Sequence, residues 1–290
     1  MNITASMVKD LREKTGAGMM DCKKALVESD GDMDKAIDYL REKGISKAAK
    51  KAERIAAEGL ANIYIKGNKA VVLELNSETD FVAKNAEFKE LLDKIGNAIL
   101  GGKAETLEDA LNIKVGSDTI NDLIVNATAK IGEKISLRRF EKVSKSAKQS
   151  FGSYLHMGGK IASLTVIDGK DENVARDVAM QAAAMRPLYT TIDSVPAEDL
   201  EHEKEVIKEQ VINEGKKPEY AGQIVEGRIR KFYEETVLEE QAFIKDGSLS
   251  VKAYLENNKC KLVSLVRYEV GEGMEKRNDN FAEEVMSQIK

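Results

Sequence analysis

The chain has 290 residues, more than one average domain, so two or more hydrophobic cores are expected. Charged residues make up 33% of it and aromatic residues 5%, without Trp, a composition typical of a helix-rich, well-solvated protein with modest cores. The formal net charge of −5 argues against a protein whose main role is to hold nucleic acid, because phosphate binding needs a concentrated cationic face.

The two cysteines and the first residues indicate a cytoplasmic protein. Cys22 and Cys260 lie far apart, without metal-type spacing, and cannot form the disulfide framework of a secreted domain. Residues 1–6 lack the charged and apolar regions of a signal peptide, and no run approaches the roughly 18 apolar residues of a membrane-spanning helix. We therefore expect a reducing cytosol and no membrane partner.

Residues 1–55 predict a small module of three amphipathic helices. Thr4 is expected to cap the first helix and Asp32 the third, and Gly44 is expected to end the third. A bundle of three short helices of this size resembles ubiquitin-associated-type domains. Its own core is small, so the module should work by contacting a partner.

The second helix of this module begins with two methionines. Its inner face is predicted to carry Cys22, Ala25 and Leu26, with Cys22 as a packed thiol. Only one of Met19 and Met20 can then face inward, and the other should be exposed as an adaptable contact residue.

A basic, alanine-rich stretch follows at Lys47–Arg54. It is open to two interpretations, an RNA contact or a solvated linking helix. The linker is favoured, because no aromatic side chain is interleaved for base stacking.

The middle of the chain contains a weak internal repeat. A strand, a Gly-containing turn and a second strand are predicted at 63–73 and again at 153–164. Each copy is followed by a predicted helix, at 81–99 in the first and at 173–185 in the second. Duplicated α+β subdomains follow from this pattern.

Later segments complete the two copies. The first should contain helices near 107–111 and 120–131 and end with an alternating strand at 133–140, whereas a strand at 262–270 should complete the second. The overall prediction is an α+β fold with five parts. These are the helical module 1–55, a first core subdomain 56–141, a second core subdomain 142–194 with 238–271, a helical insertion 195–237 and a C-terminal module 272–290.

The insertion reads as an antiparallel helical hairpin. Two apolar stripes are joined at residues 215–218, and Pro218 suits the first turn of the second helix. Each arm is too short and too charged to form a core alone, so it should dock on a partner or form a homodimer. In the C-terminal module Phe281, Val285 and Ile289 recur every four residues, which predicts one amphipathic helix.

The sequence lacks the motifs that usually indicate an enzyme active site. There is no Gly-rich phosphate loop, and Gly158–Lys160 lies between two strands, as a hairpin turn does. The two histidines, His156 and His202, are unrelated in position and pair with no nucleophile. We expect no catalytic residue, no metal and no cofactor, and hence no enzyme.

The junction at Thr79–Val82 links a predicted strand to a predicted helix. Thr79 and Asp80 are good N-cap residues, and Phe81 then falls in the first helical turn. From the residues alone, a helix cap followed by a core phenylalanine is the favoured interpretation, and an exposed contact residue is the alternative.

Two segments, 11–26 and 74–84, resemble the elongation factor Ts family of bacterial translation, and the resemblance runs along essentially the whole chain. It implies a guanine nucleotide exchange factor that binds elongation factor Tu, both GDP-bound and nucleotide-free. The factor would promote GDP release and GTP loading without covalent chemistry.

The resemblance also implies site residues. Thr79, Asp80, Phe81 and Val82 would disturb the magnesium and phosphate site of elongation factor Tu. Further contacts with that partner would come from the N-terminal module and from both core copies, through Arg12, Met19, Met20, Lys23, Ile131 and His156. The C-terminal module would lie on the same partner domain as the N-terminal one, whereas contacts of residues 101–117 are not assigned.

Two other classes of function stay open at the level of sequence. A ubiquitin-associated-like scaffold without exchange activity would explain the N-terminal module but leaves Thr79–Val82 unexplained. An RNA-binding translation accessory protein would use Lys47–Arg54, and its RNA affinity would fall steeply with salt.

Overall fold

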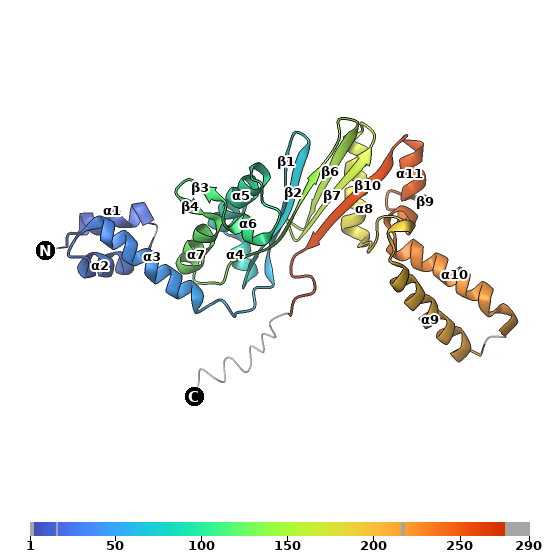
Figure 1. The fold of residues 1–290 in the computed structure, drawn as a ribbon, viewed down its shortest axis with the longest axis horizontal. Helices are drawn as coiled ribbons and strands as arrows, with labels where there is room; N and C mark the ends of the chain where they lie inside the picture. Colours follow the sequence, from blue (N-terminus) through green and yellow to red (C-terminus); the bar gives the residue numbers. More distant parts are fainter. Residues whose placement is uncertain (1–2, 16, 216–217, 276–290) are drawn as a thin grey trace. The chain divides into compact units, whose positions relative to one another are not determined.

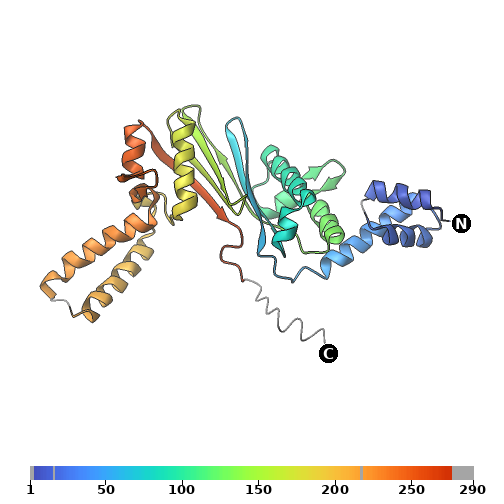
Figure 2. The ribbon, with the colours of Figure 1, turned by 180° about the vertical axis from the view of Figure 1, so that it is seen from behind.

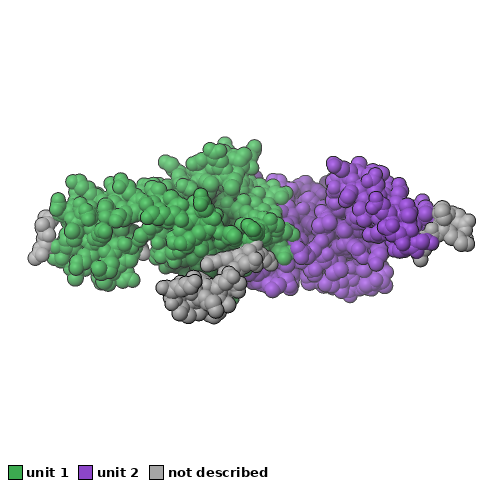
Figure 3. All heavy atoms as spheres, turned by 90° about the horizontal axis from the view of Figure 1, so that it is seen from below, with its two compact units in different colours: residues 1–65, 71–142, 268–290 green, residues 66–70, 143–267 purple. Residues whose placement is uncertain are grey.

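The computed structural model describes residues 3–15, 17–215 and 218–275, a mixture of helices and antiparallel sheets that confirms the predicted α+β class (Figure 1). The chain divides into two compact units (Figure 3). Unit 1 comprises residues 1–65, 71–142 and 268–290, and unit 2 comprises 66–70 and 143–267.

The chain begins with three helices that share a small core. They are α1 (Ala5–Thr15), α2 (Met19–Glu28) and α3 (Met33–Ala49). Their buried residues include the three predicted for the second helix, and the full set is Val8, Leu11, Cys22, Ala25, Leu26 and Ala36. The Asp32 carboxylate accepts the amides of Asp34 and Lys35, which confirms it as the cap of α3.

Helix α3 does not end at Gly44, and that prediction is wrong. The helix continues to Ala49, with Gly44 buried inside it. A Cβ placed on Gly44 would lie 3.6 Å from the Cβ of Ala129 in α7 (Ile120–Ile131). Gly44 therefore faces α7, where a methyl group would make an ordinary van der Waals contact, and does not stop α3.

A three-stranded sheet forms the centre of the first core. Its order is β1 (Glu58–Lys66), β2 (Lys69–Ser77) and β5 (Ser136–Ser144). The region also contains three helices, α5 (Ala86–Gly101), α6 (Leu107–Leu111) and α7. A short two-stranded ribbon is formed by β3 (Lys114–Val115) and β4 (Asp118–Thr119). Phe88 and Ile95 of α5 are fully buried against Leu73 and Leu75 of β2 in one apolar cluster.

Close contact between α5 and β1 depends on Gly96. A Cβ there would lie 2.1 Å from the Tyr64 ring, so only glycine fits. The Tyr64 hydroxyl donates to the Asp93 carboxylate over 2.6 Å. Burial, together with this carboxylate, raises the pKa of Tyr64 well above its ordinary value.

Two predicted boundaries in this region are wrong. The helix expected over 81–99 is two helices, α4 (Asp80–Lys84) and α5, because Asn85 is extended at ψ 140° and its side chain caps α5 through the Glu87 amide. The strand expected from residue 133 begins at Ser136. Gly132, at φ 90°, ends α7, and the next two residues turn toward α4 instead.

The second core has a sheet of the order β10-β7-β6, made from β6 (Gln149–His156), β7 (Ile161–Asp168) and β10 (Lys261–Glu269). β6 pairs with β7 from Gln149↔Asp168 to His156↔Ile161. Helix α8 (Glu172–Met185) covers this sheet (Figure 2). It approaches so closely that a Cβ on Gly152 would lie 2.0 Å from the backbone of Ala175.

The predicted helical hairpin is formed by α9 (Ala197–Asn213) and α10 (Pro218–Thr236), which share a core of Ile207, Val211 and Ile229. The short helix η1 (Ile192–Ser194) precedes the hairpin. Four short elements connect the hairpin to β10, namely η2 (Leu238–Glu240), β8 (Ala242–Phe243), β9 (Asp246–Ser250) and α11 (Val251–Asn257). From residue 276 on, the helix predicted in the C-terminal module lies outside the described residues.

Candidate partner-binding surface

Residues Thr79–Val82, which we call the tip, are the N-cap and the first turn of α4, just after β2. The Thr79 hydroxyl is the N-cap of α4 and accepts the Val82 amide over 3.4 Å. The Thr79 amide and hydroxyl also donate to the two carboxylate oxygens of Glu133, over 3.0 and 2.7 Å. The backbone at the start of the tip is therefore held by two charge-assisted hydrogen bonds.

Phe81 points outward from this turn. Its side chain is 80% exposed, whereas the next two residues, Val82 and Ala83, are buried in the apolar cluster below. The favoured interpretation of Phe81 as a core residue is therefore wrong. Val82 and Ala83 lie on the side of α4 that faces the core, and Phe81 lies on the opposite side of the helix.

A cation accompanies the exposed ring. Lys84 Nζ lies 2.6 Å from a carboxylate oxygen of Asp80 and 5.9 Å from the centroid of the Phe81 ring. The distance to the ring is within the range of a cation–π contact. Asp80 and Lys84 flank Phe81, so the tip carries an aromatic group beside an ion pair.

Sequence reasoning missed the two carboxylates that hold this region. Glu133 follows α7, and Glu78 accepts the Lys134 amide over 2.6 Å and the Arg54 guanidinium over 3.3 Å. Both act across more than 20 residues of chain, so no local spacing could reveal them. The one available signal was Gly132 at the end of α7, which predicts a turn but not what the turn binds.

The predicted residues of the N-terminal module lie on exposed parts of α1 and α2. Met19 is 59% and Met20 75% exposed, so the prediction that one of them faces inward is wrong. Both precede Cys22, where the buried face of α2 begins, and the small core does not reach the first turn of the helix. Arg12 and Lys23 are exposed as well.

The two remaining predicted residues lie on separate elements. Ile131 is the last residue of α7 and packs, half-buried, on the apolar cluster of the first core. His156 ends β6 in the other unit, exposed, with its ring stacked on Tyr154 at 6.1 Å between centroids. Its neighbours Leu155 and Met157 are 45% and 70% exposed, and sequence reasoning did not single them out.

The described residues offer little for chemistry. Within residues 3–15, 17–215 and 218–275, no group of three or more His, Cys, Asp or Glu side chains is placed to hold a metal ion. Cys22 is fully buried, and burial raises the pKa of the Cys260 thiol, which disfavours the reactive thiolate. No helix of the described part is both long and apolar enough to cross a membrane.

The model of one protein family, described as elongation factor TS, matches residues 78–272. The match begins one residue before the tip and includes Ile131 and His156, whereas the N-terminal helices lie outside it. It covers more than half of the chain and includes the whole tip. This chain belongs to the elongation factor Ts family.

Proposed function

We propose that this chain binds GDP-bound elongation factor Tu and promotes GDP release and GTP loading by disturbing the magnesium and phosphate site of that partner. As a member of the elongation factor Ts family, the chain acts in translation elongation and in nucleotide exchange on elongation factor Tu. The observation that carries the finer proposal is Phe81, a large apolar side chain held 80% exposed on a turn that Glu133 fixes.

An exposed phenylalanine of this kind supplies driving force for insertion. Burying its ring in a partner is worth about 1.5–3 kcal/mol, and this free energy can offset a rearrangement of the partner. The backbone of the tip moves little when Phe81 inserts into the partner, because Val82 is buried and Thr79 is bonded to Glu133. The groups that move on insertion are then those of the partner.

The proposed consequence is loss of the magnesium contacts that hold GDP. A bound Mg²⁺ is the largest local charge in a nucleotide site and bridges protein and phosphate oxygens. A tip that moves its ligands lowers the affinity for GDP. By reciprocal linkage, this chain then binds nucleotide-free elongation factor Tu more tightly than the loaded form.

Other contacts would add affinity without acting on the nucleotide. We propose that Arg12, Met19, Met20 and Lys23 dock as one exposed surface, that Ile131 contacts the partner beside the tip, and that His156 contacts it from unit 2. The five parts with boundaries at 55, 141, 194, 237 and 271 remain our proposal for the domain organisation.

The remaining expectations concern partners and location. Lys47 pairs with Asp21 over 3.0 Å and Arg54 with Glu78 over 3.3 Å, which supports Lys47–Arg54 as a linker and not an RNA contact. Ile212 of the hairpin is 71% exposed, so a homodimer through this hairpin remains a proposal. We propose the cytoplasm as the site of action.

The test is release of fluorescent GDP from purified elongation factor Tu, followed by stopped flow. We expect strong acceleration by this chain, and weaker acceleration by folded Phe81→Ala and Asp80→Ala variants. A chain that binds elongation factor Tu but leaves the release rate unchanged would instead be a binding scaffold. That result would reject the exchange mechanism.

A further inference from the structure

Glu74, Asn76 and Glu78, on or just after β2, are polar side chains buried in an unusual place. β2 is the middle strand of its sheet, where apolar side chains are expected, yet Glu74 and Asn76 have no exposed surface. The side chain of Glu78, which follows the strand, is 6% exposed. Buried polar groups cost stability unless they are bonded, so the segments that they bond indicate what they are for.

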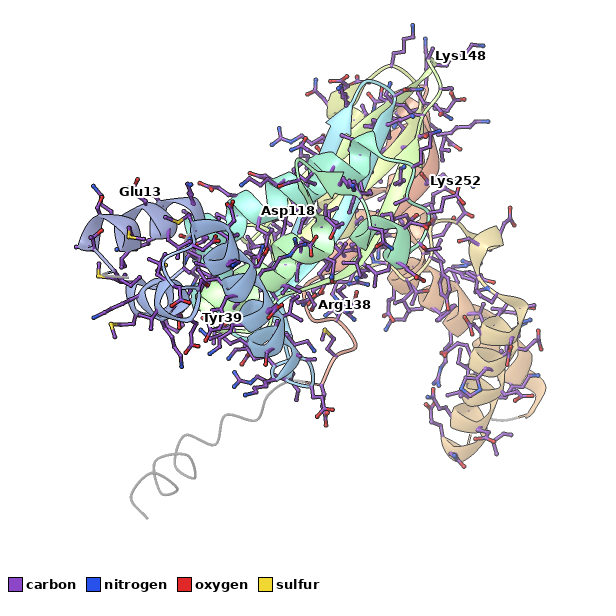
Figure 4. All side chains as sticks on the ribbon, turned by 60° about the vertical axis from the view of Figure 1, so that its left-hand side comes forward. Glu13, Tyr39, Asp118, Arg138, Lys148 and Lys252 are labelled. Carbon is purple, nitrogen blue, oxygen red and sulfur yellow. The ribbon has the colours of Figure 1, made fainter. Side chains whose placement is uncertain are left out.

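Glu74 holds the segment that follows β10. Its carboxylate accepts the Gly271 amide over 2.9 Å and pairs with Arg138 over 3.0 Å and with Arg139 over 2.6 Å. Both arginines also bind the backbone of this segment. Arg138 donates to the Glu272 carbonyl, and Figure 4 shows it beside this part of the chain.

Arg139 completes this connection from the other carboxylate oxygen. It donates to the Glu269 carbonyl over 3.0 Å, and its guanidinium lies 4.1 Å from the centroid of the Tyr268 ring. One buried carboxylate and two guanidinium groups thus fix the backbone from Tyr268 to Glu272.

Asn76 and Gly271 place the same segment against the start of β1. The Asn76 side-chain amide donates to the Glu58 carbonyl over 3.1 Å and lies 3.9 Å from the Met274 sulfur. Gly271 has φ +74°, and a Cβ there would lie 2.3 Å from the Ala57 carbonyl oxygen. The segment from Tyr268 to Met274 is therefore fixed at one place against β1 and β2.

Glu78 fixes a second segment, the linker between the N-terminal helices and the sheet. It accepts the Lys134 amide and pairs with Arg54, while Lys134 Nζ donates to the Arg54 carbonyl over 3.0 Å. Arg54 lies in the linker from α3 to β1, so this network fixes the point where the N-terminal helices join the sheet.

We propose that Glu74 and Glu78 are positioning residues for exchange. They lie four residues apart on the chain that leads into the tip. Glu74 fixes the segment Tyr268–Glu272 and Glu78 fixes the linker at Arg54, both relative to Phe81. This inference rests on the proposed function. The ligand in this proposal is a protein partner that the chain contacts at several points.

The physical gain is preorganisation. When several contact elements share one rigid base, docking of the first raises the effective concentration of the others. Fixing these two segments also lowers the conformational entropy lost on binding. Loss of Glu74 or Glu78 should therefore weaken binding of the partner while Phe81 still acts once the complex has formed.

The experiment combines hydrogen exchange and GDP release on the full chain. Glu74→Gln and Glu78→Gln are compared with Asp109→Asn, a control carboxylate of unit 1 that also accepts backbone amides, those of Glu105 and Thr106. Arg138→Gln replaces Glu74→Gln if the latter does not fold. The Thr79 amide, bonded to Glu133, reports whether the tip itself has loosened.

We expect Glu74→Gln to speed amide exchange at Gly271 by about tenfold and leave Thr79 unchanged. The concentration for half-maximal GDP release should rise about five- to tenfold, with an unchanged limiting rate. Glu78→Gln should give the same kinetic result, and Asp109→Asn neither effect.

An unchanged Gly271 amide, or a fall in the limiting rate without a change in half-saturation, overturns the positioning role. If the wild-type chain does not accelerate release, the proposed function fails. Hydrogen exchange, which needs no partner, then decides the positioning of the segments separately.

Discussion

The tip and the start of α2 both present large apolar side chains to solvent, but they hold them in opposite ways. Phe81 is 80% and Met20 75% exposed. Thr79 caps α4 and is bonded to Glu133, whereas Gly18, the N-cap residue of α2, makes no side-chain hydrogen bond to its helix. Similar exposure thus hides a difference in how the backbone beneath the side chain is fixed.

That difference indicates a division of labour. A rigid aromatic ring on a fixed backbone can displace groups of a partner, because little of its binding free energy is lost in ordering the tip. Methionine has three rotatable bonds and adapts to the surface that it meets. We therefore propose that Phe81 changes the nucleotide affinity of the partner and that Met19 and Met20 add adaptable contacts to it.

Replacement of Phe81 should give the largest effect. We expect Phe81→Ala to lower the limiting rate of GDP release by more than about tenfold, because the inserted group is gone. Its free energy of unfolding should change by less than about 0.5 kcal/mol, since the ring is exposed. Stopped-flow release and urea unfolding measure the two quantities.

The matched control is the same substitution at Phe88, seven residues later and fully buried. Phe88→Ala should lower the free energy of unfolding by about 3–5 kcal/mol. A Phe81→Ala variant that unfolds as easily as Phe88→Ala would return Phe81 to the core and remove the basis of the comparison.

Glu133 tests whether the rigidity itself matters. Glu133→Gln removes the charge that binds the Thr79 amide and hydroxyl, so the tip should loosen while Phe81 stays in place. We expect the limiting rate to fall about three- to tenfold and the free energy of unfolding by about 1–3 kcal/mol.

Glu87→Gln is the control for this substitution. It breaks an exposed ion pair with Lys130 of 2.8 Å in the same unit and should cost less than about 0.5 kcal/mol. An unchanged limiting rate in Glu133→Gln would mean that exposure of Phe81 is sufficient and that its fixed backbone is not needed.

Local patterns predicted the elements of the fold well because short-range physics decides them. The caps at Asp32 and Thr79, the helix 120–131 and the two arms of the hairpin follow from side chains within one or two turns. Gly44 misled the prediction because its role is a contact with Ala129, far along the chain.

The site could be predicted only in part for the same reason. The resemblance selected Thr79–Val82, but whether Phe81 is buried depends on which side of α4 meets the core, and periodicity over five residues does not decide that. The roles of Glu74, Glu78 and Glu133 were invisible in sequence, because the segments that they hold, at Gly271, Arg54 and Thr79, lie more than 20 residues away.

Met20 tests the adaptable half of the comparison. Met20→Ala should raise the concentration for half-maximal release about two- to fivefold, because apolar contact area is lost, and should leave the limiting rate unchanged. Met20→Leu, which keeps volume, should restore most of the affinity. A limiting rate that falls as it does for Phe81→Ala would give both regions the same role.

The smallest effect is expected at the base of α7, the helix that leads to Glu133. The Asp122 carboxylate accepts the amide and hydroxyl of Thr119, and these hydrogen bonds hold the pKa of Asp122 below its ordinary value of 3.8. A lowered pKa in the folded state contributes stability above pH 3.8 that is lost as the pH falls through the folded value.

Asp122→Asn, at the third position of the capping box, should therefore lower the free energy of unfolding at neutral pH by about 0.5–1 kcal/mol, the lower part of the range for capping interactions. The difference from wild type should shrink below pH 3.8, which urea unfolding at several pH values would measure. Because α7 carries the turn with Glu133, a pH-independent difference would show that this cap does not contribute through its charge. The fixed backbone of the tip would then owe nothing to the charge of Asp122 and would rest on contacts such as the Glu133 hydrogen bonds and the buried Val82.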